Sequence, residues 1–276
     1  MIPLASPARG GAEGGGVNPS VTTSREIGRD SSLSQRELKR NDAMDHKRLT
    51  LFAGHYGSGK TNIALNYALW LRSQGLKVTV ADLDIVNPYF RTKDGAEQLK
   101  AAGVRLISSD YANSNVDLPA LPGEAYSLVD DKSACGVIDV GGDDRGALAL
   151  GRYVPGIREE NDYEMLFVLN KARPLTRNID DALEVFYEIE AACALPFTAV
   201  VNNTNLGPLT KAEDVIAGER FAQEFAERVK LPVKMSCASE KLGPELQNKV
   251  SNFFPIQIMQ LYYMEKEGTS LGKINL

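Results

Sequence analysis

The chain has 276 residues with a hydrophobic fraction of 43%, enough to bury one sizeable core, and its net charge of −5 disfavours a protein whose main partner is nucleic acid. Neutralising a phosphate backbone requires a concentrated excess of Lys and Arg, which this composition lacks. No apolar run reaches the ~18 residues that a membrane-spanning helix needs, so we expect no membrane span. The cysteines are too far apart in the sequence for a disulfide framework or a local metal cage, and we expect a cytoplasmic protein.

Residues 1–46 are predicted to form a disordered leader. The segment is rich in Gly and Ser and lacks Phe, Trp and Tyr, so it cannot offset its ordering entropy by burial. Met44 lies just before the first strand pattern, which leaves open that translation begins there. A transit peptide is a third interpretation, disfavoured by acidic residues such as Glu13 and Asp30. Residues 47–276 are predicted to form a single domain.

From Arg48 onward, short apolar runs alternate with helical patterns. The runs predict strands at LTLFA, KVTVADL, VRLIS, CGVIDV, EMLFVLN, FTAVVNN and LPVKMSC. The segments between them predict helices from Lys60 to about Gln74, near Gly95 to Ala102, from Asn178 to Ala192 and from Lys211 to Val229. This order predicts an α/β fold with a doubly wound, mostly parallel sheet flanked by helices. Ligands of such sheets bind beyond the carboxyl ends of the strands.

The segment GHYGSGKT follows the first predicted strand and opens the first predicted helix, and it matches the phosphate-loop pattern G-x-x-x-x-G-K-[ST]. Glycines let consecutive backbone N–H groups point at a phosphate, and the helix N-terminus adds partial positive charge. Lys60 is expected to contact the β- and γ-phosphates and Thr61 to bind Mg²⁺. The domain at 47–276 is therefore predicted to be of the P-loop NTPase type. The residues predicted to bind the nucleotide here are Gly54, His55, Tyr56, Gly57, Ser58, Gly59, Lys60, Thr61 and Asn62.

Two further segments offer the carboxylates that a phosphoryl-transfer site needs for Mg²⁺ and for the attacking water. Asp82 and Asp84 end a buried strand pattern, and because side chains alternate along a strand, at most one of them is expected to face the phosphates directly. Asp139 ends CGVIDV, and DVGG matches a γ-phosphate-sensing pattern in which the Gly142 N–H contacts the γ-phosphate. The alternative for each segment is a solvated strand end. The predicted metal ligands are Thr61, Asp82, Asp84 and Asp139.

Together, GHYGSGKT, ADLD and DVGG resemble the MinD/ParA/Mrp-like group of P-loop ATPases, also described as CobQ/CobB/MinD/ParA-type nucleotide-binding proteins. The resemblance covers roughly Arg48 to the C-terminus. It implies ATP and Mg²⁺ as ligands, and a nucleotide-dependent homodimer with the two phosphate loops face to face. It assigns Asp84, with Lys60, to catalysis, because Asp84 matches the acidic residue that polarises the attacking water. Asp82 would be an outer Mg²⁺ partner and Asp139 the second-switch aspartate.

The chain departs from this group at His55, where many members carry a lysine that reaches the partner's nucleotide across the dimer. A neutral imidazole cannot reliably stabilise transition-state charge as a lysine does. Arg91 or Arg145 is a candidate replacement, and an exposed arginine without this role is the alternative for each. Without a replacement, we expect turnover to be slow.

The sequence favours adenine over guanine as the base. Guanine recognition in related folds uses NKxD or TKxD, but NKAR places Arg173 where the aspartate would fall. In the resembled group an asparagine after the next strand contacts the adenine, which indicates Asn202 as first choice and Asn203 as second. A turn formed by an Asn-rich loop is the alternative.

Three functions remain open from the sequence. The first is a slow, Mg²⁺-dependent ATPase that acts as a nucleotide-driven switch on an unidentified client protein, for example in maturation or metallocentre assembly. The second is a nucleotide-gated binding module with negligible turnover, whose dimer state is the output. The third is an ATP-dependent, carboxylate-activating synthetase, because such enzymes share the broader fold. Metal delivery through thiols is disfavoured, since the chain has no CxxC pair and its cysteines lie in apolar patterns.

Overall fold

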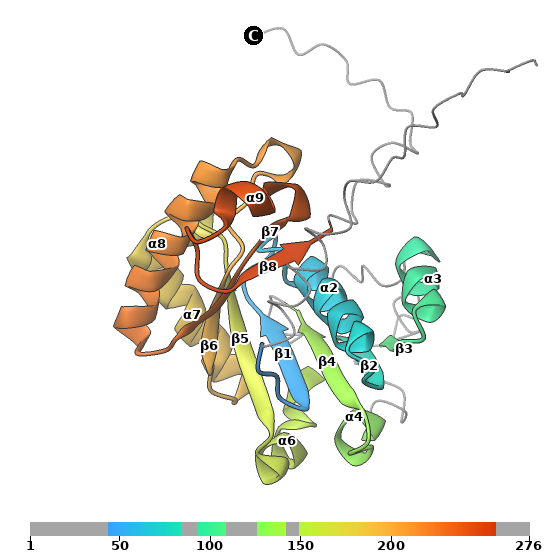
Figure 1. Ribbon diagram of the computed structural model, residues 1–276. Helices are drawn as coiled ribbons and strands as arrows, with labels where there is room; N and C mark the ends of the chain where they lie inside the picture. Colours follow the sequence, from blue (N-terminus) through green and yellow to red (C-terminus); the bar gives the residue numbers. More distant parts are fainter. Residues whose placement is uncertain (1–43, 84–92, 109–125, 142–148, 258–276) are drawn as a thin grey trace, which may run out of the picture. The chain divides into compact units, whose positions relative to one another are not determined.

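The computed structural model describes residues 44–83, 93–108, 126–141 and 149–257. Within these ranges eight strands form one sheet in the order β3-β2-β4-β1-β5-β6-β7-β8, and every neighbouring pair is parallel (Figure 1). The predicted doubly wound, mostly parallel sheet is confirmed. The strands are β1 (Leu49–Ala53), β2 (Val78–Leu83), β3 (Arg105–Ser108), β4 (Cys135–Val140), β5 (Tyr163–Leu169), β6 (Ala199–Asn202), β7 (Val233–Ser239) and β8 (Phe253–Ile256).

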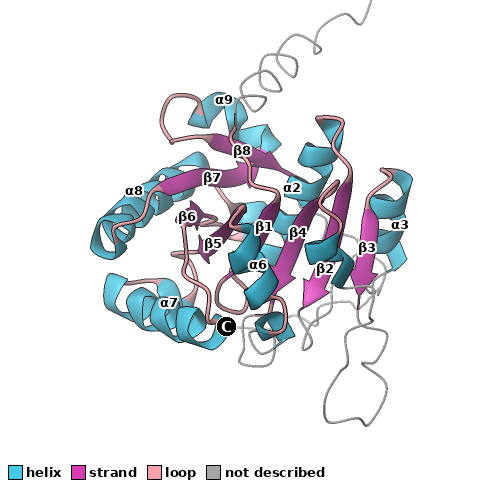
Figure 2. Cartoon of the chain, turned by 90° about the horizontal axis from the view of Figure 1, so that it is seen from below, coloured by secondary structure: helices cyan, strands magenta, loops and turns pink. Residues whose placement is uncertain are grey.

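Helices flank the sheet on both faces, as the view in Figure 2 shows. The four predicted helices all form, each within two residues of its predicted bounds: α2 (Lys60–Ser73), α3 (Lys93–Ala101), α7 (Ile179–Cys193) and α8 (Ala212–Val229). The shorter helical elements are α4 (Ser127–Asp130), α6 (Val154–Glu160), α9 (Gly243–Leu246), η3 (Pro174–Thr176), η4 (Gly207–Leu209) and η5 (Glu240–Leu242). The start of α7 is fixed by the Asn178 side chain, which accepts from the Asp181 N–H at 2.9 Å.

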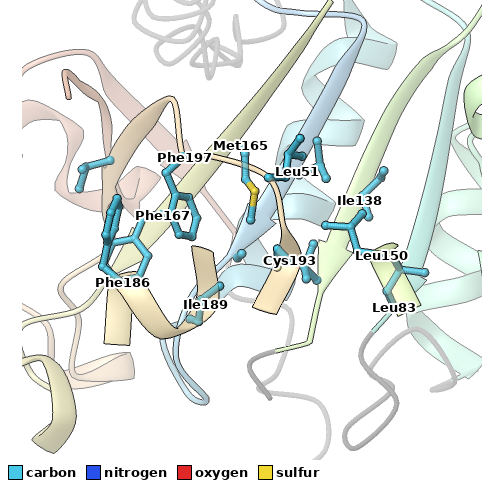
Figure 3. Close-up of a cluster of buried hydrophobic side chains, with 14 of the residues drawn as sticks. Leu51, Leu83, Ile138, Leu150, Met165, Phe167, Phe186, Ile189, Cys193 and Phe197 are labelled. Atoms are coloured by element: carbon cyan, nitrogen blue, oxygen red, sulfur yellow. The ribbon is translucent and has the colours of Figure 1, made fainter. Parts of the chain in front are cut away.

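The core lies on both faces of the sheet because alternate side chains of each strand enter different hydrophobic clusters. Leu51 belongs to the cluster beneath α6, α7 and α8, whereas its neighbour Phe52 belongs to the cluster beneath α2. Figure 3 shows the first cluster, in which Phe167 of β5 meets Phe186 of α7 and also Phe197. These rings meet edge to face with centroids 5.2 Å apart, a favourable aromatic geometry. Packing on both faces holds the strands in place, and therefore positions the loops that follow their carboxyl ends.

Strand β8 was not predicted from the sequence. It contains Pro255, which cannot donate a ladder hydrogen bond and is therefore compatible only with a position at the edge of a sheet. The structure places β8 at that edge, with Pro255 paired with Ala238 of β7. Phe254 is 2% exposed and packs in the core. Beyond β8, the Asn66 amide of α2 binds both the N–H and the carbonyl of Gln257.

The described part of the chain begins at Met44, so the predicted leader over residues 1–43 lies outside it. Residues 45 and 46, which the prediction included in the leader, contact the domain. The ammonium of Lys234 donates to the Asp45 carbonyl at 2.7 Å, and the ring of His46 meets Trp70 edge-on at 6.1 Å. Among the helices that the structure describes, none has the length and apolar character needed to cross a bilayer.

Candidate functional site

The phosphate-loop segment lies at the carboxyl edge of the sheet, between β1 and α2, where β4 and β5 flank β1 on either side. Its neighbours are therefore the ends of β4 and β5, with the end of β6 one strand further along. The loop and the first turn of α2 form hydrogen bonds with side chains from these strand ends: Asp139 of β4, Arg173 after β5 and Asn203 after β6. A doubly wound sheet is expected to bind its ligands at this edge.

Glycines shape the loop backbone through left-handed φ angles and through close contacts with neighbouring segments. Gly57 and Gly59 have φ angles of 75° and 90°, in the left-handed region that favours glycine. A Cβ atom on Gly59 would lie 2.3 Å from the amide nitrogen of Asn203, and one on Gly54 would lie 2.6 Å from the Val168 carbonyl oxygen. The loop therefore packs directly on β5 and on the segment after β6, which leaves its curled backbone as the lining of the site.

The start of α2 is suited to an anion. Its N-cap residue, Gly59, has no side chain to cap the helix, and its first turn carries no acidic residue. Lys60 is the first helical residue and is 4% exposed, which places a cation inside the site. The Ser58 hydroxyl is buried and has no hydrogen-bond partner among the described residues. This set of donors fits the phosphate groups of a nucleotide.

The Thr61 hydroxyl donates to a carboxylate oxygen of Asp139 at 2.5 Å. Asp139 is completely buried on β4, and its register partner on β2 is Asp82, which is 3% exposed. Paired positions of adjacent strands project to the same face, so the two carboxylates lie side by side behind Thr61. A hydroxyl with two carboxylates is an oxygen donor set of the kind that Mg²⁺ prefers. Within the described ranges, no group of three or more His, Cys, Asp or Glu side chains is placed to hold a metal.

Asn202, the first choice for the base contact, is a structural residue in this fold. It is completely buried, and its amide hydrogens are donated to the Val215 carbonyl at 3.2 Å and the Ser236 hydroxyl at 2.8 Å. Its oxygen accepts from the Thr204 N–H at 3.1 Å. These bonds join β6 to α8 and β7. Because the donors of the amide are already used inside the protein, the structure gives no support to a ligand contact at this side chain.

Asn203, the second choice, lies against the phosphate loop. Its side-chain nitrogen donates to the Ser58 carbonyl at 2.7 Å, and its backbone N–H donates to the Leu169 carbonyl at 2.8 Å. Its side-chain oxygen is buried without a partner among the described residues. The structure therefore links Asn203 to the shape of the loop.

Two side chains after β5, which the sequence did not mark as site residues, connect the segments beside the loop. Asn170 is completely buried, and its side-chain oxygen accepts from the backbone N–H groups of Ala172 and Asn205 at 3.0 and 3.3 Å. Arg173 donates from Nε to the Gly57 carbonyl at 2.8 Å. The sequence analysis used Arg173 only as evidence against guanine. Its position directly after a buried parallel strand was the signal that could have identified it.

Several predicted residues lie outside the described part of the chain or show a local role. Asp84, Gly142, Arg91 and Arg145 are outside the described residues. The Nδ1 atom of His55 lies 2.9 Å from the Tyr56 carbonyl oxygen, a contact within the loop. The roles that the resemblance implies for these residues stay predictions.

The three cysteines are separated in the fold and buried: Cys135 on β4, Cys193 at the end of α7 and Cys237 on β7. Burial raises the pKa of the Cys193 thiol to about 12 and raises the pKa of the Cys237 thiol further. Since the thiolate is the metal ligand and the nucleophile, these side chains behave as small hydrophobes.

Comparison with known proteins gives similarity at the level of structure. No protein-family model matches the sequence, and no curated protein matches it. The chain is similar to the cell division protein FtsY from Thermotoga maritima, with 19% identity, 76% of this chain and 70% of that chain covered, and a TM-score of 0.50.

Two further solved structures are similar at lower scores. One is the signal recognition particle receptor FtsY from Elizabethkingia anophelis in complex with GDP, with 17% identity, 73% of this chain and 63% of that chain covered, and a TM-score of 0.42. The other is a nucleotide-binding protein in complex with ADP from Archaeoglobus fulgidus, with 14% identity, 72% and 85% covered, and a TM-score of 0.39. Identities this low carry no group assignment, so the MinD/ParA/Mrp-like resemblance stays a prediction. The parallel sheet and the Thermotoga structure together show that this chain has the P-loop NTPase fold.

Proposed function

We propose that this protein binds a nucleoside triphosphate with Mg²⁺ at residues 54–62 and acts as a nucleotide-driven switch on a client protein, with slow hydrolysis. The observation that carries the proposal is the bond between Thr61 and Asp139 at 2.5 Å, directly behind a glycine-lined loop. The hydroxyl and the buried carboxylate can bind the magnesium ion. The curled backbone at the helix N-terminus can bind the phosphates.

The chain's own residues divide this work. The loop N–H groups, the start of α2 and Lys60 would hold the phosphates, and Thr61, Asp139 and Asp82 would hold the metal. Bound Mg²⁺ supplies charge neutralisation for the phosphate oxygens. Asp139 is kept in place by its bond to Thr61 and by its position within β4. We propose in addition that Asp84 orients the attacking water and that Gly142 contacts the terminal phosphate.

We propose ATP as the nucleotide. A guanine-reading site needs a carboxylate acceptor after β5, and the corresponding residue here is Arg173, a donor that is bonded to the loop. Asn203 is the asparagine after β6 that touches the loop, so it replaces Asn202 as our candidate for the adenine side of the site.

Exposed apolar side chains around the loop support a partner at this edge. They come from the loop, from η3 after β5, and from η4 and the residue before it after β6: Tyr56 at 61% exposure, Leu175 at 50%, Leu206 at 50% and Leu209 at 77%. Large apolar side chains gathered at one edge are typical of an interaction surface. We propose that this edge receives a second copy of the chain when the triphosphate is bound, and that the dimer state is what the client protein reads.

The test is equilibrium binding of MgATP, MgADP and MgGTP, together with light scattering and phosphate release, on wild type and on Lys60→Ala. We expect the wild type to bind MgATP more tightly than MgGTP and to dimerise with the triphosphate, and we expect Lys60→Ala to lose nucleotide affinity while keeping its fold. The exposed Lys100 on α3 provides a matched control, Lys100→Ala, which should behave as wild type.

Each alternative has its own outcome in this experiment. ATP-dependent dimerisation with no phosphate release would favour the nucleotide-gated binding module. Phosphate release that requires an added small carboxylic acid would favour the synthetase. Unchanged nucleotide affinity in Lys60→Ala would show that the assigned loop is not the site.

A further inference from the structure

A second positive charge reaches the phosphate loop from the connection between β5 and α7. The Nε atom of Arg173 donates to the carbonyl of Gly57 at 2.8 Å, although the two residues are 116 positions apart. The side chain also lies over the loop itself, because a Cβ atom on Gly57 would be 3.7 Å from its Nε and 4.0 Å from its Cδ. Arg173 therefore lies across the segment that we propose to hold the phosphates.

The backbone around Arg173 is held by a short hydrogen-bonded turn. The N–H of Arg173 donates to the Asn170 carbonyl at 3.0 Å, and the Thr176 N–H donates to the Arg173 carbonyl at 3.1 Å. The Thr176 hydroxyl, which is buried, also donates to the Asn170 carbonyl at 2.6 Å. Pro174 follows and favours the extended conformation that Arg173 adopts, with ψ at 142°. The backbone of Arg173 is therefore held in place while its side chain contacts the loop.

The contact with Gly57 uses only the Nε atom of the guanidinium, so its two terminal nitrogens are not used by the loop. Only Nε is engaged with the loop, and across the described residues Arg173 forms no ion pair with a carboxylate. A guanidinium is planar and carries a fixed positive charge, so the two terminal nitrogens remain as donors beside the loop. Phosphate oxygens are the acceptors that such a pair of donors matches best.

Within the described residues, neither of the other two cations in the β5–α7 connection forms a hydrogen bond with the loop. The ammonium of Lys171 lies over the ring of Phe221 of α8, 5.5 Å from its centroid. Arg177, at the end of the same connection, makes no contact with the loop among the described residues. Arg173 is the exposed cation of the β5–α7 connection that reaches the loop.

We propose that Arg173 is a phosphate-contacting residue: it keeps its Nε bond to Gly57 and uses its terminal nitrogens to bind the last phosphate of a nucleoside triphosphate. The proposal rests on the proposed function. Arg173 would be a second cation, in addition to Lys60, that contacts the phosphates. Because the charge acts on the last phosphate, the site distinguishes a triphosphate from a diphosphate.

The test compares the affinities of MgATP and MgADP, measured by calorimetry, in wild type, Arg173→Met, Arg173→Lys and the control Arg177→Met. We expect Arg173→Met to weaken MgATP binding about tenfold or more, which is the size of a lost charge-assisted hydrogen bond, and to weaken MgADP far less. The lysine in Arg173→Lys has a single side-chain nitrogen, which can bind either the loop carbonyl or the phosphate. The loss of MgATP affinity in this variant should therefore lie between those of wild type and Arg173→Met. Arg177→Met should match wild type.

The ratio of the two affinities separates the possible roles. Equal weakening of MgATP and MgADP in Arg173→Met would show that Arg173 only supports the loop, and no change in either affinity would show that it has no role; both results overturn this proposal alone. If the wild type bound neither nucleotide, the proposed function would fall and this proposal with it. Thermal unfolding of Arg173→Lys and Arg173→Met checks that each variant is folded.

Discussion

The hydroxyl of Thr61 and the carboxylate of Asp139 are joined by a hydrogen bond of 2.5 Å, which connects the first turn of α2 to the end of β4. The two residues are 78 positions apart, and the sheet brings them together because β4 is the direct neighbour of β1. An oxygen pair placed this way offers Mg²⁺ one ligand from each side of the loop.

We expect Thr61→Val, which removes the hydroxyl at nearly constant volume, to weaken nucleotide binding in Mg²⁺ about tenfold or more, the effect of one lost charge-assisted contact. With Mg²⁺ chelated, wild type and variant should have the same affinity, because the hydroxyl acts through the metal. Titration calorimetry under both conditions provides the comparison. Equal affinities in Mg²⁺ would mean that Thr61 serves only to orient Asp139.

Gly59→Ala should destabilise the fold more than Gly75→Ala. Both glycines have left-handed φ angles, 90° and 82°, but a Cβ on Gly59 would meet the Asn203 amide at 2.3 Å, whereas nothing lies within 4 Å of a Cβ on Gly75. The Asn203 side chain is buried and bonded to Ser58, so it cannot move aside freely. Urea unfolding should show an extra loss of about 1–3 kcal/mol for Gly59→Ala. Similar losses in both variants would show that backbone strain alone decides the effect.

Much of the fold was predictable because its strands are buried on both faces. Runs such as LTLFA and CGVIDV are apolar at nearly every position, and the motif GHYGSGKT fixes the place of the first loop and helix. These signals are local in the sequence. Strand β8 was missed because Pro255 masks its pattern, and only its position at the edge of the sheet makes that proline acceptable.

The roles of individual side chains were less predictable, because they depend on contacts between distant segments. No local pattern decides which of Asn202 and Asn203 faces the loop, since the strand ends between them and its alternation no longer applies. Arg173 reaches Gly57 only because β5 and β1 are neighbours in the sheet. Residues that follow adjacent strands must be considered together before such a site can be recognised.

Substitution of Asn202 should mainly lower stability, whereas substitution of Asn203 should mainly weaken nucleotide binding. Asn202→Ala leaves buried groups of Val215, Ser236 and Thr204 without their partner, so its free energy of unfolding should fall by about 2–3 kcal/mol, with little change in nucleotide affinity. Asn203→Ala removes the bond to the loop and should weaken nucleotide binding more than it lowers stability. Urea unfolding and nucleotide titration on both variants test this. A larger loss of affinity in Asn202→Ala than in Asn203→Ala would reverse the assignment.

A partly buried ion pair at the amino ends of the strands should make stability depend on pH. Arg48 donates from Nε and Nη2 to the two carboxylate oxygens of Glu160, and its Nη1 donates to the backbone carbonyls of Leu128, Asp131 and Ala134. The guanidinium of Arg48, more than any other group, lowers the pKa of Glu160 below its ordinary value of 4.5. A lowered pKa in the folded state means that the pair stabilises the protein above pH 4.5.

That stabilisation is lost as the pH falls from 4.5 through the lower pKa that Glu160 has in the folded protein. We therefore expect Glu160→Gln to lower the free energy of unfolding by about 2 kcal/mol at pH 7, because it leaves the partly buried Arg48 without its counter-charge. The gap between wild type and variant should narrow at acidic pH, where wild-type Glu160 becomes protonated. Urea unfolding at pH 7 and below pH 4.5 measures the gap, and Glu159→Gln, at the exposed neighbouring position, is the matched control. A gap that stays constant with pH would show that the pair contributes packing and hydrogen bonds alone.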